Sequence, residues 1–105
     1  MVRVLVYPVK GAPYTHEIEP TLENMQELVG GHIQMVSLGA MTGLPQFNPY
    51  LLVCNEEGKL LGLPANRAVG FDIIAGQFFI IKEDKQGELV SLSSSEVTEI
   101  TSFLE

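Results

Sequence analysis

The residues best suited to bind a ligand lie around one predicted turn. Asn55 and Lys59 flank the turn, and Asn66 and Arg67 follow the next apolar run. An arginine guanidinium is a rigid fork of N–H donors that suits phosphate or carboxylate, and asparagine amides can pair with the edge of a base or a ribose. Tyr50 adds an aromatic ring on which a purine could stack. We therefore predict that Asn55, Lys59, Asn66, Arg67 and Tyr50 bind a small anionic or nucleotide-like ligand.

Each of these residues also has a structural interpretation. Asn55 can simply begin a turn through its own side chain, as asparagines commonly do. Arg67 can pair with a nearby carboxylate, Glu56, Glu57 or Asp72, and so hold loops together. Tyr50 can belong to the core, where aromatic residues near strands are often found.

No group of residues predicts catalysis or a metal site. Cys54 is the single cysteine and lies in an apolar run, so we expect a buried, unreactive thiol. One thiol and two separated histidines, His16 and His32, lack the spacing of a zinc site. We therefore expect a protein that is not an enzyme and has no catalytic residue, metal or cofactor.

The N-terminal part of the chain predicts a β-hairpin. Residues 2–9 are rich in β-branched residues and apolar on both faces, as in an interior strand, with Pro8 near its end. Residues 10–13 predict a turn, and residues 14–19 alternate like a half-exposed partner strand.

The next segment predicts a helix followed by a strand. Thr21 can be the N-cap, glycines at 30–31 can end the helix, and the apolar stripe comprises Leu22, Met25, Leu28 and Val29. Residues 32–38 resume strand character. Residues 39–49 predict a loop of about ten residues, long enough to raise the question of a functional role.

The middle of the chain predicts a second hairpin. Residues 50–54 are apolar throughout and predict a buried strand. Residues 55–58 suit a tight turn closed by a positive φ at Gly58, and residues 59–61 would run back as a short partner strand. Residues 62–67 predict another turn.

The C-terminal part predicts strands and a final helix. Residues 72–81 form the most apolar strand, in which Gly76 indicates a bulge, a bend or the close approach of another backbone. Residues 88–92 predict a short edge strand. A capping box at Ser93 and Glu96 begins a helix whose apolar stripe comprises Val97, Ile100 and Leu104.

These elements predict an α+β fold. It is a curved, mainly antiparallel sheet of five to seven short strands with two amphipathic helices, in the order ββαβ(loop)βββα. Glycines at 62, 70 and 76 would allow enough bending for the sheet to approach a small barrel.

Composition narrows the class of protein. The chain has 105 residues, of which 46% are hydrophobic and 18% charged, and this size predicts one globular domain spanning residues 1–105. A net charge of −7 opposes binding to duplex nucleic acid. No apolar run is long enough for a membrane helix and the N-terminal apolar run is too short for a secretory signal, so we expect a cytoplasmic protein without a membrane partner. The high apolar fraction of so small a domain also predicts a homo-oligomer whose interface contributes to the pocket.

Three segments of the chain resemble domain of unknown function 3846, a family of small proteins found mostly in phages and on mobile elements. The similarity extends from about residue 2 to the final helix, and the matching residues lie at 21–33, 54–67 and 72–80. Asn66 and Arg67 belong to its most specific part, whereas residues 39–49 match nothing in the family.

The resemblance implies no activity by itself. It does imply a gene placed among those that counter host defence, and hence the cytoplasm of a bacterial host. Small acidic phage proteins of this kind act as sponges for nucleotide-derived signals or as inhibitors that bind a protein. We therefore expect a non-catalytic phage anti-defence protein that sequesters a small anionic signal. The alternative is an inhibitor of a host defence protein that binds through an acidic surface or a sheet edge.

Overall fold

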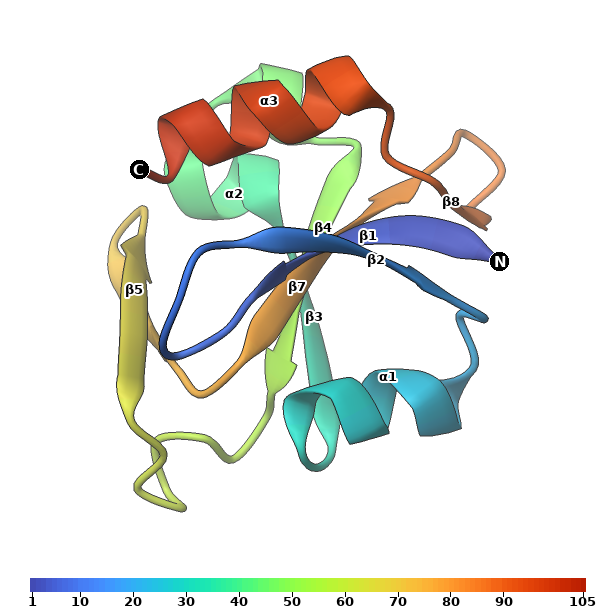
Figure 1. The fold of residues 1–105 in the computed structure, drawn as a ribbon. Helices are drawn as coiled ribbons and strands as arrows, with labels where there is room; N and C mark the ends of the chain where they lie inside the picture. Colours follow the sequence, from blue (N-terminus) through green and yellow to red (C-terminus); the bar gives the residue numbers. More distant parts are fainter.

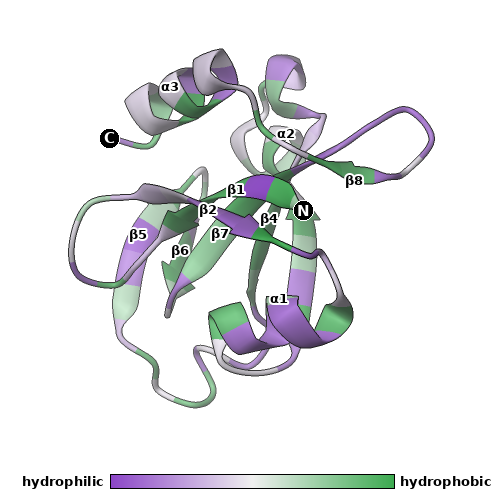
Figure 2. Cartoon of the chain, turned by 45° about the vertical axis from the view of Figure 1, so that its right-hand side comes forward, coloured by the Kyte–Doolittle hydropathy of each residue, from purple (hydrophilic) through white to green (hydrophobic).

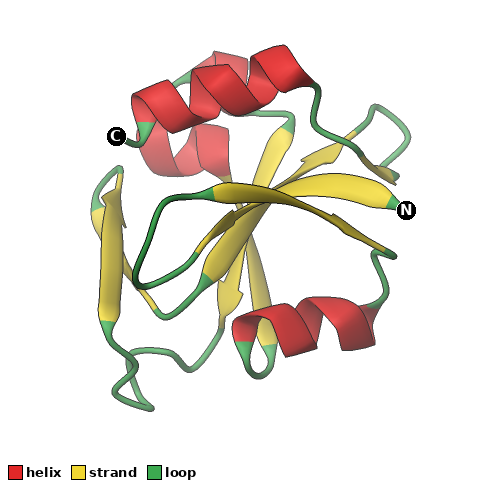
Figure 3. Ribbon diagram, in the orientation of Figure 1, coloured by secondary structure: helices red, strands yellow, loops and turns green.

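The computed structural model describes residues 1–105 and has helices on both faces of a central antiparallel sheet (Figure 1). Helix α1 (Leu22–Val29) covers one face, and α2 (Leu38–Thr42), the 3-10 turn η1 (Pro45–Phe47) and α3 (Ser94–Phe103) lie on the other. Figure 3 shows this separation of the helices. The α+β class predicted from the sequence is confirmed.

The strands form two sheets. The main sheet has six strands, paired in the order β2-β1-β7-β4-β3 with β8 also on β7, and every pairing is antiparallel. Strands β5 and β6 form a separate two-stranded sheet, which we call the β5–β6 hairpin. The main sheet stays open and does not close into a barrel. The strands are β1 (Val2–Tyr7), β2 (Tyr14–Ile18), β3 (Ile33–Ser37), β4 (Tyr50–Asn55), β5 (Ala65–Val69), β6 (Asp72–Ala75), β7 (Phe78–Glu83) and β8 (Leu89–Val90).

Strand β7 lies at the centre of the main sheet, and its side chains enter two different cores. Phe78 and Ile80 belong to a cluster of 14 buried residues beneath α2, α3 and the β5–β6 hairpin. Phe79 and Ile81 belong to a cluster of 8 buried residues beneath α1. Alternation along a strand sends neighbouring side chains to opposite faces, so a continuous apolar run is what a strand between two covering layers requires. Figure 2 shows mainly hydrophobic residues along β7 and β4, whereas α1 carries both hydrophobic and hydrophilic residues.

Helix α1 begins and ends where its sequence predicts. The Thr21 hydroxyl accepts a hydrogen bond of 3.1 Å from the backbone N–H of Asn24, and Gly30 ends the helix in the left-handed conformation. Met25 and Val29 are buried against the sheet, but Leu22 is 57% exposed, so the apolar stripe is shorter than predicted.

Helix α3 has the predicted capping box. The Ser93 hydroxyl accepts the N–H of Glu96, and the Glu96 carboxylate accepts the N–H of Ser93. Ile100 and Leu104 are buried in the larger core. None of the helices is long and apolar enough to cross a membrane.

Residues 39–49 are not the irregular loop predicted from the sequence, because they contain most of α2 and all of η1. The Ser37 hydroxyl caps α2 by accepting the N–H of Ala40, and Gly43 ends the helix with φ 73°. Phe47 is buried in the larger core. A helix of five residues is too short to show a helical repeat, so its sequence gave no periodic signal.

The predicted hairpin between residues 50–54 and 59–61 is wrong. Strand β4 pairs with β3 and β7, while residues 56–64 form turns. Gly58 does not have a positive φ; a Cβ there would lie 2.8 Å from the Ala75 carbonyl oxygen, so a close backbone approach explains the glycine.

Residues 62–67 contain the start of a strand, and not only the predicted turn, because β5 pairs with β6 from Ala65 onward. Residues 72–81 likewise divide into β6 and β7. Gly76 lies between them with φ 83°, so the bend is correct among the three alternatives that the sequence left open.

Candidate functional site

A groove runs between the β3–β4 end of the main sheet and strand β6, and we call it the β3–β6 groove. It consists of two adjoining hollows, a polar one of about 270 Å³ and an apolar one of about 340 Å³. Both hollows are lined by Gln34, Cys54, Asp72 and Ile74. The groove therefore joins a polar end to an apolar end.

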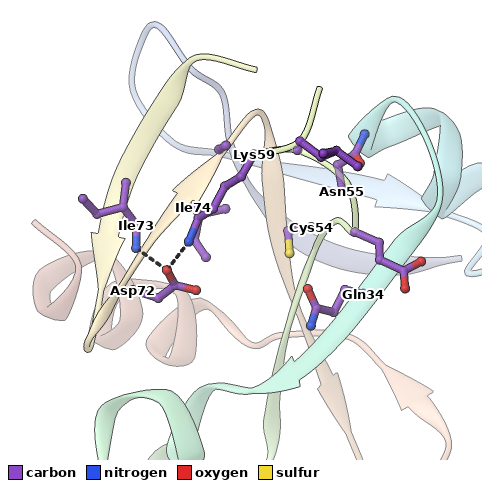
Figure 4. Close-up of a pocket in the computed structure, with 11 residues that line it drawn as sticks. Gln34, Cys54, Asn55, Lys59, Asp72, Ile73 and Ile74 are labelled. Carbon is purple, nitrogen blue, oxygen red and sulfur yellow. Dashed lines mark hydrogen bonds and ion pairs between the residues drawn. The ribbon is translucent and has the colours of Figure 1, made fainter. Parts of the chain in front are cut away.

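The register of the strands positions the floor of the groove. Gln34 on β3 lies opposite Cys54 on β4, so both side chains face the β5–β6 hairpin. Ile74 of β6 is buried in the same core as Cys54 and holds the hairpin against the sheet. Figure 4 shows the Cys54 sulfur and the Gln34 amide directed toward the space beside Asp72.

An exposed ion pair borders the polar end. The Lys59 ammonium lies 2.5 Å from a carboxylate oxygen of Asp72, and these side chains are 66% and 54% exposed (Figure 4). The hydrogen bond from Lys59, helped by one from the Ile73 N–H, lowers the pKa of Asp72. Asp72 is therefore a carboxylate at neutral pH. Because the pair is exposed, water or a ligand can replace either partner at little cost.

The apolar end is lined by aliphatic side chains and one aromatic ring. Residues contributing only to this end are Val36, Ala40, Met41, Leu52, Val69 and Phe71. Phe71 is completely exposed at the tip of the β5–β6 hairpin. Burial raises the pKa of the Cys54 thiol, and the Asp72 carboxylate raises it further, so this group on the groove floor stays protonated and weakly nucleophilic.

Asn55 borders the groove but its amide has a structural role. It is buried, its Nδ2 donates to the Val29 carbonyl at 3.4 Å, and its Oδ1 accepts the Glu57 N–H at 2.8 Å. It therefore ties the end of α1 to the turn after β4, as the structural interpretation predicted. In Figure 4 the amide lies toward α1 and away from Asp72.

Asn66 joins the β5–β6 hairpin to the main sheet. Its Nδ2 donates to the carbonyl oxygens of Tyr7 at 2.8 Å and of Gly76 at 3.0 Å. Both amide protons are used within the protein. The residue lines neither hollow of the groove.

Arg67 lies away from the groove and faces the C-terminal end of α3. One guanidinium N–H group donates to the Leu104 carbonyl, and the guanidinium carbon lies 4.9 Å from the centre of the Tyr7 ring. No carboxylate pairs with it, so the alternative of a pairing with Glu56, Glu57 or Asp72 is wrong. A cation at a helix C-terminus is favourable, and α3 has no basic residue of its own in the last turn.

Tyr50 is a core residue. Its ring is 4% exposed, and its hydroxyl donates to Glu96 at 3.0 Å. Burial raises the pKa of Tyr50, with the hydrogen bond to Glu96 and the Glu96 charge adding to the shift. A stacking role toward a ligand is therefore not available to Tyr50 in this fold.

The predicted binding residues are thus divided among separate places. Asn55 and Lys59 border the β3–β6 groove, Asn66 and Tyr50 make internal contacts, and Arg67 borders another hollow beside α3. The expectation that they form one cluster is wrong. Ligand binding at Lys59 stays a prediction.

The largest single hollow is unsuited to an anion. It lies between β2 and α1, has a volume of about 490 Å³, and is bordered by Glu17, Glu19 and Glu27. Three carboxylates would repel a negatively charged ligand. Nowhere in the chain do three or more His, Cys, Asp or Glu residues come together as a metal site.

Several groove residues were missed from the sequence. Gln34 and Met41 come from a predicted strand and a predicted loop, and only the packing of the β5–β6 hairpin brings Asp72 and Phe71 beside them. The one available signal was Gly70-Phe71, an aromatic residue directly after a glycine, which is unusual at a hairpin tip.

Comparison with known proteins gives a family and no activity. A family model described as Domain of unknown function (DUF3846) matches residues 1–105. No curated protein and no solved structure matches the chain.

Proposed function

Because this chain belongs to the DUF3846 family, whose function is unknown, we propose its function from the geometry of the groove: it is a non-catalytic protein that binds a small, nucleotide-like ligand carrying one anionic group. The observation that carries this proposal is that the polar and apolar hollows of the β3–β6 groove share four lining residues, Gln34, Cys54, Asp72 and Ile74. Its apolar end suits a flat ring, and its polar end offers an exposed lysine within the same channel.

The charges at the polar end support a singly charged ligand. Lys59 can turn from Asp72 to an anionic group, and Asp72 can then accept a hydrogen bond from a sugar hydroxyl. Glu56 also borders this end, so a ligand with several phosphates would meet two carboxylates and one ammonium. A polyphosphate is therefore disfavoured.

The groups along the groove favour binding without turnover. Cys54 is a protonated thiol, and neither histidine lines either hollow. Together with the resemblance to phage proteins, this supports sequestration of a nucleotide-derived signal as an anti-defence role in the cytoplasm of a bacterial host. The amount of ligand held would then equal the amount of protein.

A direct test is to mix the purified protein with cyclic mononucleotides, which carry one charge, and with ADP-ribose derivatives, whose diphosphate the groove disfavours, then to filter each mixture and measure the free ligand. We expect one ligand to be retained and to be released chemically intact on denaturation. Full recovery of every candidate in the filtrate would refute small-ligand binding, and a chemically altered ligand would refute the non-catalytic assignment.

Two variants localise the binding, each with a matched control. Lys59→Ala removes the ammonium at the polar end, and Ala40→Trp fills the apolar end from an exposed position. Each should weaken binding at least about tenfold. The lysine change removes a hydrogen bond to a charged group, which contributes roughly 1.5–3 kcal/mol, and the tryptophan occupies the space of the ligand. Lys85→Ala and Ala12→Trp make the same changes on exposed turns outside the groove and should bind like the parent chain.

A second candidate is a protein-binding inhibitor of a host defence factor. It is favoured by exposed apolar side chains on the β5–β6 hairpin and the turns before it: Leu60, Leu61, Phe71 and Ile73 are each more than half exposed. Native mass spectrometry of the protein purified from host cells separates the candidates. A retained small molecule supports the first, and a stoichiometric protein partner without one supports the second.

A further inference from the structure

Strand β3 has one free edge. It pairs with β4 on one side only and ends the main sheet opposite β2. The Glu56 N–H donates to the His32 carbonyl, so alternation along the antiparallel pair turns residues 32, 34 and 36 toward β4. The backbone N–H and C=O groups of Ile33 and Met35 therefore point outward and can accept another strand.

The two edges of the main sheet differ in how they are protected. Strand β2 carries His16 and Glu17, and Glu17 forms an ion pair of 3.7 Å with Arg3. Strand β3 contains no charged residue and no proline, and its register with β4 is unbroken. Edge strands normally carry charged side chains, prolines or bulges, because these features prevent pairing with another chain. The edge formed by β3 is thus open to strand addition.

The charge pattern indicates which chain would pair there. No Asp, Glu, Lys or Arg occurs between Glu27 and Glu56, although the chain carries a net charge of −7. This charge-free segment forms β3, α2, η1 and the largely buried β4, and β3 contributes the exposed residues Gln34 and Met35. A basic partner would bind most favourably to an acidic face of the protein. A second copy of this acidic chain would meet the least electrostatic repulsion at the charge-free β3 edge.

We propose that two copies of this chain associate through β3, antiparallel across a two-fold axis near Met35. Met35 is at the middle of β3, and its side chain is 39% exposed. A two-fold axis makes such a contact self-complementary, so the outward N–H and C=O groups of one Met35 meet those of its copy. The main sheets of the two copies then form one continuous sheet.

The surroundings of β3 add apolar area to this interface. Phe71 and Val36 line the same hollow, and Phe71 is fully exposed in the single chain. Pairing of a five-residue strand alone buries less than the roughly 800 Å² per partner of a typical interface. The exposed ring of Phe71 is an apolar group able to enlarge it. This inference does not depend on the ligand of the proposed function.

The test is sedimentation equilibrium of the ligand-free protein over concentrations from micromolar to hundreds of micromolar. The parent chain should sediment as two copies. Met35→Lys lowers the net negative charge of each chain but places two ammonium groups together at the axis, so the dissociation constant should rise at least about 100-fold. Met35→Pro removes an outward N–H that β4 does not use and should act in the same direction.

Thr15→Lys is the matched control, because it makes the same charge change on the exposed β2 edge. It should remain dimeric, and far-ultraviolet circular dichroism should show all three variants folded. A monomeric parent chain, or a dimer that survives both Met35 changes, would overturn the proposal. If the protein is a dimer without ligand but binds no nucleotide in the filtration assay, only the proposed function is refuted.

Discussion

The main sheet and the β5–β6 hairpin are held in place by different interactions. The four residues Phe78–Ile81 of β7 are completely buried between two cores. The hairpin contributes only Val69 and Ile74 to a core, and polar contacts of Asn66, Arg67 and Lys59 complete its attachment. One wall of the groove therefore belongs to a sheet that is buried on both faces, whereas the other wall is held by two buried side chains and a few hydrogen bonds.

The largest expected effect is in the main sheet. Phe79→Ala removes a fully buried ring from the core beneath α1 and should lower the free energy of unfolding by about 4 kcal/mol. Phe71→Ala removes the same ring from the exposed hairpin tip and should change it by less than about 0.5 kcal/mol. Urea denaturation measures both. A similar loss in the free energy of unfolding for the two variants would contradict this difference between the regions, because it would mean that the hairpin tip is packed.

The next effect compares two ion pairs: Lys82–Glu96, which is mostly buried, and Lys59–Asp72, which is exposed. Glu96 is 18% exposed and accepts hydrogen bonds from Lys82, Tyr50 and the Ser93 N–H. Burial acts to raise the pKa of Glu96, but these hydrogen bonds outweigh it and lower the pKa to about 2. A carboxyl with a depressed pKa in the folded state stabilises the protein fully above its unfolded pKa, near 4.5, and loses that contribution as pH falls toward 2.

Glu96→Gln should therefore cost about 3 kcal/mol at neutral pH, and the loss of stability on acidification from pH about 5 to 2 should become shallower. Asp72→Asn is the counterpart in the exposed pair on the hairpin and should cost less than about 1 kcal/mol. Thermal unfolding at a series of pH values checks both. An unchanged acid slope in the Glu96 variant would contradict the assignment of the pH dependence to this carboxyl.

The third and smallest of the three main losses of stability tests the attachment of the hairpin. Asn66→Ala leaves the carbonyls of Tyr7 and Gly76 without their donor, at a cost of roughly 2 kcal/mol. Hydrogen exchange should speed up in β5 and β6 and stay slow in β7, because the hairpin opens as a local unit. Ala68→Ser, at an exposed position of the same strand, is the control. Uniform acceleration throughout the chain would show that the two regions unfold together.

Local signals in the sequence predicted much of the main sheet correctly. The caps at Thr21 and Ser93 are each formed by residues three positions apart, so their chemistry is visible in the sequence. The continuous apolar run of β7 likewise reports its surroundings directly, whereas four of the five residues of β2 are exposed and the alternation predicted there is not seen in burial. The hairpin prediction at residues 55–61 failed because Gly58 is required by the carbonyl of Ala75, a contact that no local pattern reveals.

The candidate site was predictable only in part. Lys59 was recognised by its chemistry, and the structure places it on the groove. Arg67 is equally suited to bind an anion. Its guanidinium instead donates a hydrogen bond to the Leu104 carbonyl, 37 residues away, and lies over the ring of Tyr7. Asn66 reaches the Tyr7 carbonyl across 59 residues. Residue type shows what a side chain can bind. It does not show whether the folded protein already provides an internal partner for that side chain.

By itself, the sequence determined the α+β class, the ends of α1 and α3, and the absence of charge from Glu27 to Glu56, because these properties depend on residues close together in the chain. Only the tertiary structure decided that the β5–β6 hairpin folds over β4 and creates the groove. That outcome depends on packing between distant segments, where small differences in contact free energy select one arrangement among several that the local pattern allows.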